Sequence, residues 1–283
     1  MSTVLRIGAV EYLNAKPLIC DLPDLLPECE LRLEVPSRLA DDLADGKLDV
    51  ALIPAIEYFR GVHYRIVPGI AIASAGAVLS VTLFARKPLP EIASVALDVG
   101  SRTSVALAQI LLQQRYRLRP HWQTLPLDQP AELSPADAVL LIGDRAMRAA
   151  LPGFPYSYDL GREWHEWIGL PFVYAVWAVR EGVPAQPLLS ALQESKRRGL
   201  ARLAQIAWEE SRRLGLDPAF CRRYLDTVIH YDLGRPELRG LRRFYLLACE
   251  LGLALPGVPV RLLRAKKETP ASRPARSTSR FPS

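Results

Sequence analysis

Short apolar runs alternate with amphipathic stretches in the first part of the chain. Residues 4–10, 31–37 and 49–55 are strand-length and largely apolar, whereas residues 37–46 have the spacing of a helix that ends at a glycine. Strands that alternate with helices are typical of a parallel α/β sheet. The pattern therefore predicts βαβ units of the usual right-handed kind.

The rhythm changes after residue 63. Residues 64–85 carry two strand-like runs with no helix between them, and a new α/β series follows with a strand at 94–100 and a long amphipathic helix at 101–118. A further strand is predicted at 169–180, and only helical patterns come after it. This change of rhythm indicates that a second folding unit begins part-way along the chain.

The order of elements predicts an α/β fold with two lobes. Residues 1–85 and 176–264 form the first lobe with its C-terminal helices, and residues 86–175 form the second. Two extended segments would join these lobes as a hinged clamp, and the cleft between them is the expected ligand site.

The charge of the chain is concentrated at its C-terminal end. The net charge is +6, but residues 265–283 hold five Lys/Arg against one Glu, so that only about +2 belongs to the rest. This Pro/Ser/Arg-rich tail has no apolar period and is expected to be disordered. A basic tail alone is a weak argument for a nucleic-acid partner, and we predict none.

The remaining composition predicts a cytoplasmic protein without a membrane anchor. The apolar content of 49% is that of a globular protein, and the longest apolar stretch, within residues 68–85, is broken by Gly and Ser. The N-terminus enters a strand without a leader pattern. The four cysteines have no C-x-x-C spacing and predict neither a zinc site nor a disulfide framework.

Polar residues follow several of the predicted strands. Tyr12 and Asn14 come after the first strand, Ser74 lies in the antiparallel stretch, and Asp144 follows the strand within 136–142. In open α/β sheets, ligands bind outside the carboxyl ends of the strands. Asn14 could instead form an Asx turn, and Asp144 could instead cap a helix.

The stretch GSRTSVALAQ is the strongest local signal for a binding site. A strand ends at Gly100, and Ser101, Arg102, Thr103 and Ser104 then open a helix. Hydroxyls and unpaired backbone N–H groups at the positive end of a helix dipole form a site for a carboxylate or phosphate. Simple helix capping by a hydroxyl is the alternative. The chain has no nucleophile elbow, Walker loop, HExxH or GxGxxG motif.

Five segments in order carry a family resemblance. RIGAVEYLNAKPL, DVALIPAIEY, ALDVGSRTSVALAQILL, AVLLIGDRAM and YDLGREWHEWIGLPFVYAVWAVR resemble the chorismate dehydratases of the futalosine route to menaquinone, over roughly residues 5–260. The resemblance implies the two-lobed fold of type II periplasmic binding proteins. It also implies conversion of chorismate to 3-[(1-carboxyvinyl)oxy]benzoate and water, without a metal or organic cofactor.

The resemblance suggests a role for each candidate residue. Residues 101–104 would hold a substrate carboxylate, Asn14 would orient the hydroxyl or the reacting edge of the ring, and Tyr12 and Ser74 would line the pocket. Asp144 is a candidate ligand contact. No dedicated base is evident, so the enolpyruvyl carboxylate of the substrate is the candidate proton acceptor.

Three alternatives remain open from the sequence. A sister family on the same fold makes 1,4-dihydroxy-6-naphthoate with a histidine base in LIHEG, where this chain has LIGDR with Gly143 and Asp144. A non-catalytic protein that binds a small carboxylate would share the clamp. A ligand-sensing domain of a transcription regulator would also share it. The sequence does not indicate an oligomeric state.

Overall fold

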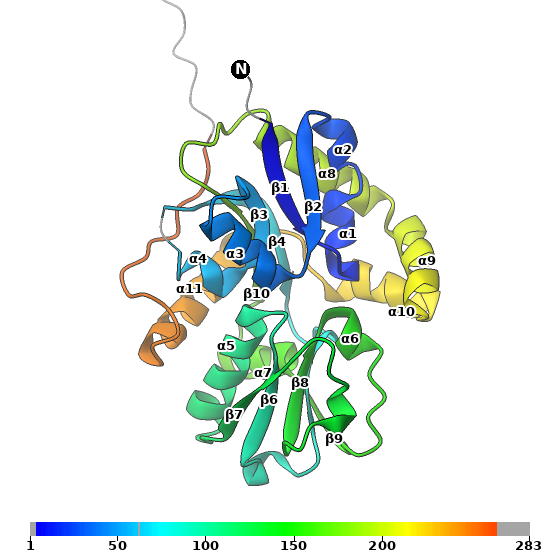
Figure 1. Ribbon diagram of the computed structural model, residues 1–283, viewed down its shortest axis with the longest axis vertical. Helices are drawn as coiled ribbons and strands as arrows, with labels where there is room; N and C mark the ends of the chain where they lie inside the picture. Colours follow the sequence, from blue (N-terminus) through cyan, green and yellow to red (C-terminus); the bar gives the residue numbers. More distant parts are fainter. Residues whose placement is uncertain (1–3, 62, 265–283) are drawn as a thin grey trace, which may run out of the picture.

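Two five-stranded sheets form two lobes of the molecule, as Figure 1 shows. The computed structural model describes residues 4–61 and 63–264. The basic tail predicted for residues 265–283 lies outside the described residues.

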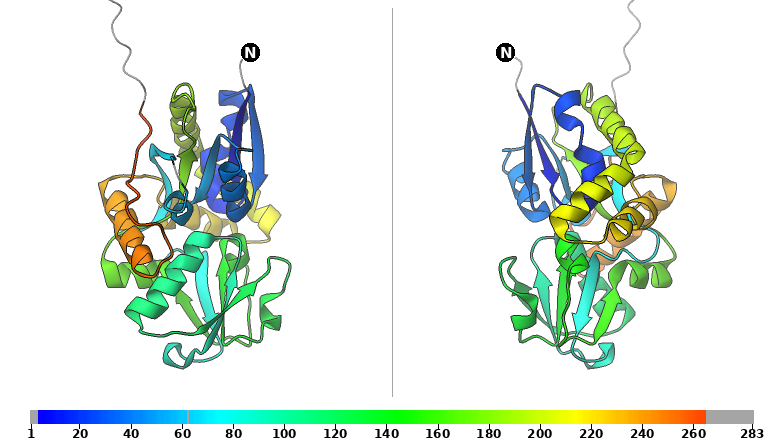
Figure 2. Two further views of the ribbon diagram at one scale, coloured as in Figure 1. Left: turned by 60° about the vertical axis from the view of Figure 1, so that its left-hand side comes forward. Right: turned by 90° about the vertical axis from the view of Figure 1, so that its right-hand side faces the viewer.

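The first lobe combines the N-terminal strands with one late strand. Its sheet has the order β2-β1-β3-β10-β4. The strands are β1 (Leu5–Val10), β2 (Cys29–Glu34), β3 (Val50–Pro54), β4 (Arg65–Ser74) and β10 (Phe172–Val179). The helices are η1 (Leu13–Ala15), α1 (Lys16–Ile19), α2 (Leu22–Leu25), α3 (Pro36–Ala44), α4 (Ala55–Tyr58), α8 (Leu188–Ala201), α9 (Leu203–Leu214), α10 (Pro218–Arg223), η5 (Tyr224–Val228) and α11 (Arg235–Glu250). Helices cover both faces of this sheet (Figure 2).

The second lobe contains the middle of the chain. Its sheet has the order β7-β6-β8-β5-β9. The strands are β5 (Val81–Ala85), β6 (Ser94–Asp98), β7 (His121–Leu125), β8 (Ala138–Ile142) and β9 (Tyr156–Asp159). The helices are η2 (Leu89–Glu91), α5 (Arg102–Ile110), η3 (Leu111–Arg115), η4 (Ala131–Leu133), α6 (Gly143–Met147) and α7 (Leu160–Ile168).

Parallel pairing turns the carboxyl ends of both sheets toward the junction of the lobes. In the first sheet β1 runs parallel to β2 and β3, and in the second β6 runs parallel to β7 and β8. The return strand β10 is antiparallel to β3 and β4, and β5 is antiparallel to β8 and β9. Loops that follow the parallel strands therefore face each other between the lobes.

The lobe boundaries differ by several residues from the predicted ones. Strand β5 belongs to the second sheet, although the prediction kept residues up to 85 in the first lobe. Strand β10 starts at Phe172 in the first sheet, although the predicted boundary of the first lobe was at residue 176. An apolar run looks the same in a hairpin partner and in a strand that crosses to another sheet, so hydropathy did not separate them.

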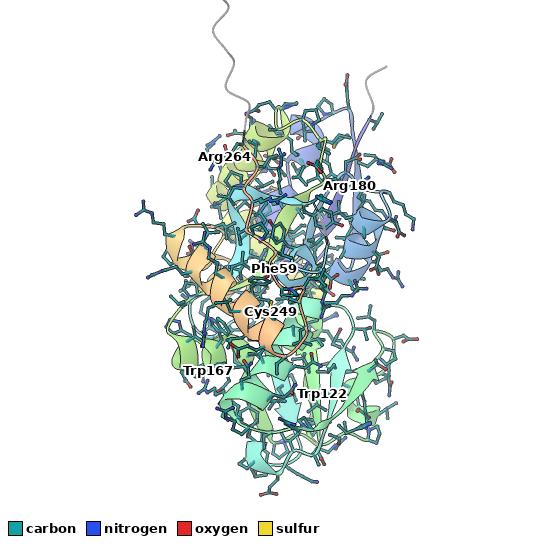
Figure 3. All side chains as sticks on the ribbon, turned by 90° about the vertical axis from the view of Figure 1, so that its left-hand side faces the viewer. Phe59, Trp122, Trp167, Arg180, Cys249 and Arg264 are labelled. Atoms are coloured by element: carbon teal, nitrogen blue, oxygen red, sulfur yellow. The ribbon has the colours of Figure 1, made fainter. Side chains whose placement is uncertain are left out.

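Aromatic residues pack helix α11 against the junction of the lobes. Trp164 of α7, Phe172 of β10 and Phe244 of α11 form edge-to-face contacts, with ring centroids 5.0 to 6.4 Å apart. Phe59 after α4 stacks on Tyr245 of α11 at 4.3 Å. Figure 3 shows Phe59 labelled beside α11, which runs obliquely past both lobes. None of the helices described is both long and apolar enough to cross a membrane.

Candidate functional site

A narrow cavity of about 40 Å³ lies between the lobes. The first lobe lines it with Val10, Tyr12, Asn14, Pro36, Pro54 and Ile72, which lie in or just after β1, β2, β3 and β4. The second lobe lines it with Ser80, Val81, Ser101, Ser104, Ile142 and Gly143. Val78 in the first crossover and Tyr174 and Ala175 of β10 complete the wall. This is the cleft that the two-lobed prediction expects.

The wall of the cleft is mostly apolar and carries no formal charge. Its polar side chains are the amide of Asn14 and the hydroxyls of serines and tyrosines, and no Asp, Glu, His, Lys, Arg or Cys is among the described lining residues. Burial raises the pKa of both Tyr12 and Tyr174 above the ordinary value for tyrosine, so both are neutral near pH 7. The wall therefore offers hydrogen bonds, and a substrate ion would be its only full charge.

Asn14 lies in a hydrogen-bonded chain that joins three parts of the fold. Its Nδ2 donates to the hydroxyl of Tyr224 at 3.2 Å, and that hydroxyl donates to Oγ of Ser80 at 2.8 Å. The other amide atom, Asn14 Oδ1, is buried and has no partner among the described residues. A buried acceptor without a partner is costly unless a ligand or water donates to it.

The N-terminus of α5 presents two serines to the cleft. Ser101 is the N-cap, whose Oγ accepts from Ser104 N at 3.5 Å and lies 3.1 Å from Ser104 Oγ. Residues three apart share a helix face, so both hydroxyls lie on the same side of the first turn. Helix capping and ligand binding, the two roles that the sequence suggested for this segment, are compatible in this geometry.

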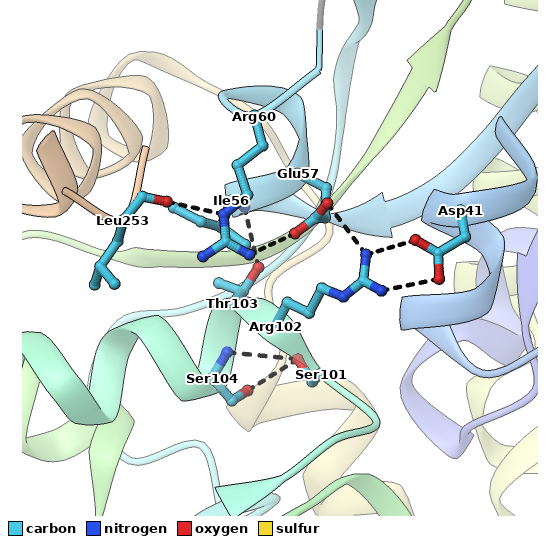
Figure 4. Close-up of polar contacts among 9 residues, drawn as sticks. All are labelled: Asp41, Ile56, Glu57, Arg60, Ser101, Arg102, Thr103, Ser104 and Leu253. Carbon is cyan, nitrogen blue, oxygen red and sulfur yellow. Dashed lines mark hydrogen bonds and ion pairs between the residues drawn. The ribbon is translucent and has the colours of Figure 1, made fainter. Parts of the chain in front are cut away.

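Arg102 reaches across to Asp41 and Glu57 of the first lobe, as Figure 4 shows. Its two terminal nitrogens each lie 2.8 Å from a carboxylate oxygen of Asp41 in α3, and one also lies 3.3 Å from Glu57 in α4. These partners belong to the first lobe, whereas Arg102 belongs to the second. The structure therefore places Arg102 in a contact between lobes and not among the residues that line the cavity.

Thr103 also contacts the first lobe. Its side chain is fully buried, and Oγ1 accepts a hydrogen bond from the backbone N–H of Ile56 in α4 at 3.2 Å (Figure 4). This bond satisfies one of the free N–H groups at the start of α4. The predicted ligand segment 101–104 thus divides into two residues that face the cleft and two that hold the lobes together.

Asp144 supports the loop that carries Asn14. Its Oδ1 accepts from the backbone N–H of Leu13 at 3.1 Å, and its other oxygen lies 3.5 Å from Arg213 of α9. Burial raises the pKa of the carboxyl, and the Leu13 N–H and the Arg213 charge partly offset this. Asp144 is not among the residues that line the cavity, so its contacts indicate a supporting role.

Tyr12 packs against the glycine that precedes Asp144. Gly143 has a φ of +57°, and a Cβ at this position would lie 3.0 Å from two ring carbons of Tyr12. That distance is shorter than ordinary side-chain contacts allow. The tyrosine ring therefore occupies the space that a side chain at 143 would need.

Ser74 does not line the cavity but contacts a residue that does. Its Oγ donates to the backbone oxygen of Gly76 at 3.2 Å and lies 3.1 Å from the hydroxyl of Tyr174, which does line the cavity. The serine that reaches the cleft in this part of the chain is Ser80. Both serines follow apolar runs, and their order in the sequence did not indicate which one faces the ligand.

Asp159 positions the crossover that carries Ser80. Its carboxylate caps α7 through Arg162 N at 3.0 Å and accepts from the backbone N–H groups of Val78 at 3.0 Å and Leu79 at 2.7 Å. Leu79 has a φ of +62°, which a non-glycine residue rarely adopts. These bonds hold the loop that leads into β5 in one conformation.

Two residues of this site gave little sequence signal. Tyr224 comes from the helical C-terminal part of the chain, and Tyr174 is one of several aromatic residues in a buried strand. Only the fold brings them to Asn14 and Ser74. Within residues 4–61 and 63–264, no group of three or more His, Cys, Asp or Glu is arranged to hold a metal ion.

Comparison with solved structures confirms the fold. A protein from Archaeoglobus fulgidus superposes with a TM-score of 0.72 at 19% identity, and covers 89% of this chain and 99% of its own. The periplasmic aliphatic sulphonate-binding protein SsuA from Escherichia coli gives 0.64 at 16% identity, with 100% and 98% covered. These likenesses establish the two-lobed fold of periplasmic binding proteins.

Comparison of sequences establishes the family. The chorismate dehydratase of Thermus thermophilus is 35% identical over 268 residues, which cover 84% of this chain and 93% of the relative. That of Campylobacter jejuni is 29% identical over 87% of this chain and 99% of the relative. The family profile described as menaquinone biosynthesis matches residues 5–250. The chain therefore belongs to the menaquinone biosynthesis family.

Proposed function

We propose that this protein is a chorismate dehydratase, a carbon–oxygen lyase that converts chorismate to 3-[(1-carboxyvinyl)oxy]benzoate and water. The observation that carries the proposal is the cleft between the lobes, where the unpartnered Oδ1 of Asn14 lies in a wall shared with the N-terminus of α5. The curated relatives from two bacteria carry the same name.

The reaction needs orientation more than strong chemical groups. A proton leaves the ring carbon that bears the enolpyruvyl ether, its electron pair forms a ring double bond, and the neighbouring C–O bond breaks to release hydroxide. Aromatisation supplies a large driving force. A cleft that holds the substrate in one pose and excludes bulk water supplies the rest.

The first turn of α5 is the proposed carboxylate site. Ser101 and Ser104 offer hydroxyls on one face of that turn, and the positive end of the helix dipole favours an anion there. Neither Arg102 nor Thr103 is needed for this contact. We therefore assign carboxylate binding to the two serines and to the backbone N–H groups of the turn.

Asn14 and Ser80 are proposed to act on the leaving group. Asn14 Oδ1 would accept a hydrogen bond from the substrate hydroxyl and fix its direction, and the Ser80 hydroxyl would donate to the oxygen as negative charge develops on it. The proton from the ring would pass to the enolpyruvyl carboxylate, because the described lining residues include no carboxylate, amine or imidazole. That carboxylate would then protonate the hydroxide, so that water leaves.

The naphthoate synthase alternative lacks its base in this chain. The resemblance places the histidine base of that family at position 143, where this chain has a glycine with a φ of +57° against the ring of Tyr12. The absence of a histidine at this position favours the dehydratase.

The test is a direct assay. Purified protein is incubated with chorismate without added metal, and products are followed by liquid chromatography and mass spectrometry. The proposal predicts loss of one water at a rate proportional to enzyme concentration. Binding of chorismate without conversion would support a non-catalytic binding protein, whereas conversion of cyclic futalosine alone would support the synthase.

A further inference from the structure

Tyr224 belongs to the C-terminal helices and contacts the cleft residues Asn14 and Ser80. It is fully buried at the first position of the π-helical segment η5, and its ring lies parallel to that of Phe220 at 6.4 Å. A π-helical turn inside a helix often marks a functional position, because the extra residue changes where the following side chains point. Here it accompanies a tyrosine that contacts two residues of the proposed site.

The hydroxyl of Tyr224 has a defined polarity. A tyrosine hydroxyl has one proton, and it donates that proton to Ser80 Oγ at 2.8 Å. Its oxygen therefore accepts from Asn14, which it does through Nδ2 at 3.2 Å. Because Nδ2 is held in this bond, Oδ1 is the amide atom left for the ligand.

The same polarity applies to Ser80. Ser80 Oγ accepts the proton of Tyr224, and its own proton has no acceptor within the part of the chain that the structure describes. That proton is free to point to a ligand oxygen. A serine that already accepts from a buried phenol is also a better donor, because successive hydrogen bonds polarise one another.

We infer that Tyr224 is a positioning residue, which sets Asn14 as acceptor and Ser80 as donor toward one substrate hydroxyl and couples the first lobe to the start of β5. This inference rests on the proposed dehydratase function. Burial raises the pKa of Tyr224, so the hydroxyl stays protonated and keeps its donor role over the working pH range.

The test compares two buried tyrosines. Tyr224→Phe removes the hydroxyl that joins Asn14 and Ser80, whereas Tyr231→Phe removes a buried hydroxyl that has no partner among the described residues. We expect Tyr224→Phe to lower kcat about 10-fold with KM changed less than about twofold. Tyr231→Phe should retain the wild-type kcat, and thermal unfolding of both variants checks that each is folded at the assay temperature.

A double variant tests whether the effect passes through Ser80. If it does, Ser80→Ala and Tyr224→Phe combined will be no slower than the slower of the two single variants. Equal kcat for Tyr224→Phe and Tyr231→Phe in an active enzyme would overturn the inference and leave the proposed function intact. A folded wild-type enzyme that does not convert chorismate would overturn both.

Discussion

The guanidinium of Arg102 spans the two lobes and meets the carboxylate of Asp41 with both terminal nitrogens, each at 2.8 Å. Arg102 opens the helix whose N-terminus faces the cleft, and Asp41 lies in α3 of the first lobe. The pair therefore links the proposed carboxylate site to the opposite lobe, and it can form only while the lobes are close together.

Replacing Arg102 by Gln should weaken substrate binding more than catalysis. The side chains of Arg102 and Asp41 are 33% and 57% exposed. Exposed ion pairs of this kind contribute about 1 kcal/mol or less, so the loss of this pair should raise KM by up to about fivefold. The kcat of the closed complex should stay near wild type. High salt should reduce the difference, because it screens the exposed pair.

Arg38→Gln is the matched control for this variant. Arg38 pairs with Glu34 at 3.2 Å within the first lobe, so its loss leaves the contact between lobes unchanged. Steady-state kinetics of both variants at low and high salt would decide whether the Arg102–Asp41 pair supports closure of the lobes. A KM for Arg102→Gln that equals that of Arg38→Gln would show that the pair does not support closure.

Asn14→Ala should lower kcat about 100-fold if the amide acts on the leaving hydroxyl in the transition state. The variant removes Oδ1, which has no partner among the described residues, and Nδ2, which donates to Tyr224. The backbone of η1 remains held by the hydrogen bond from Leu13 N to Asp144. Turnover measured by product formation, together with the thermal midpoint, separates this effect from unfolding. Unchanged turnover by a folded variant would remove Asn14 from the mechanism.

Helix geometry explains why the sequence predicted part of the site. Asn14, Ser101 and Ser104 directly follow strands, and the rule for the carboxyl ends of parallel strands places them at the cleft. Arg102 and Thr103 were predicted with the same segment, but residues one and two positions along a helix turn to other faces. The sequence indicated a segment that reaches the cleft and did not resolve the face of each residue.

Long-range contacts explain what the sequence did not predict. Tyr224 is 210 residues from Asn14 and 144 residues from Ser80, and it lies in a stretch with only a helical pattern. The choice of Ser74 in place of Ser80 has a related cause. The boundary at residue 86 kept the whole antiparallel stretch in one lobe, whereas the chain crosses between β4 and β5.

Gly143→Ala should disturb Tyr12 as well as the backbone. A φ of +57° costs a non-glycine residue about 1–2 kcal/mol, and the added Cβ would lie 3.0 Å from the tyrosine ring. Gly215→Ala is the control, because its φ is +66° and a Cβ there meets nothing within 4 Å. Gly143→Ala should lose at least as much stability in urea as Gly215→Ala, and only Gly143→Ala should lower kcat/KM. Equal kcat/KM for the two would contradict the role of this contact.

The pH profile of kcat should be flat between about pH 6 and 9, because the described lining residues include no group with an ordinary pKa in that range. Burial raises the pKa of Tyr12 and Tyr174, which keeps both protonated throughout. A fall below about pH 5 would reflect protonation of substrate carboxylates. A midpoint near pH 7 would instead indicate a titrating enzyme base and would contradict proton transfer to the substrate itself.

Asp159→Ala should destabilise the protein more than loss of a helix cap alone. Asp217→Ala is the matched control, because Asp217 caps α10 through a single bond to Phe220 N at 2.9 Å. Loss of such a cap costs about 1 kcal/mol. Asp159 makes the equivalent bond to Arg162 and also binds two N–H groups of the crossover, so its loss should cost about 2–4 kcal/mol.

The crossover bonds also give this variant a functional effect. Without the Asp159 carboxylate, the positive φ of Leu79 is no longer held by its N–H bond, and the following Ser80 should lose its fixed direction toward the cleft. We therefore expect a lower kcat for Asp159→Ala and an unchanged kcat for Asp217→Ala. Urea unfolding and product formation, measured on the same samples, test both parts. An equal loss of stability in the two variants would show that the crossover does not depend on Asp159.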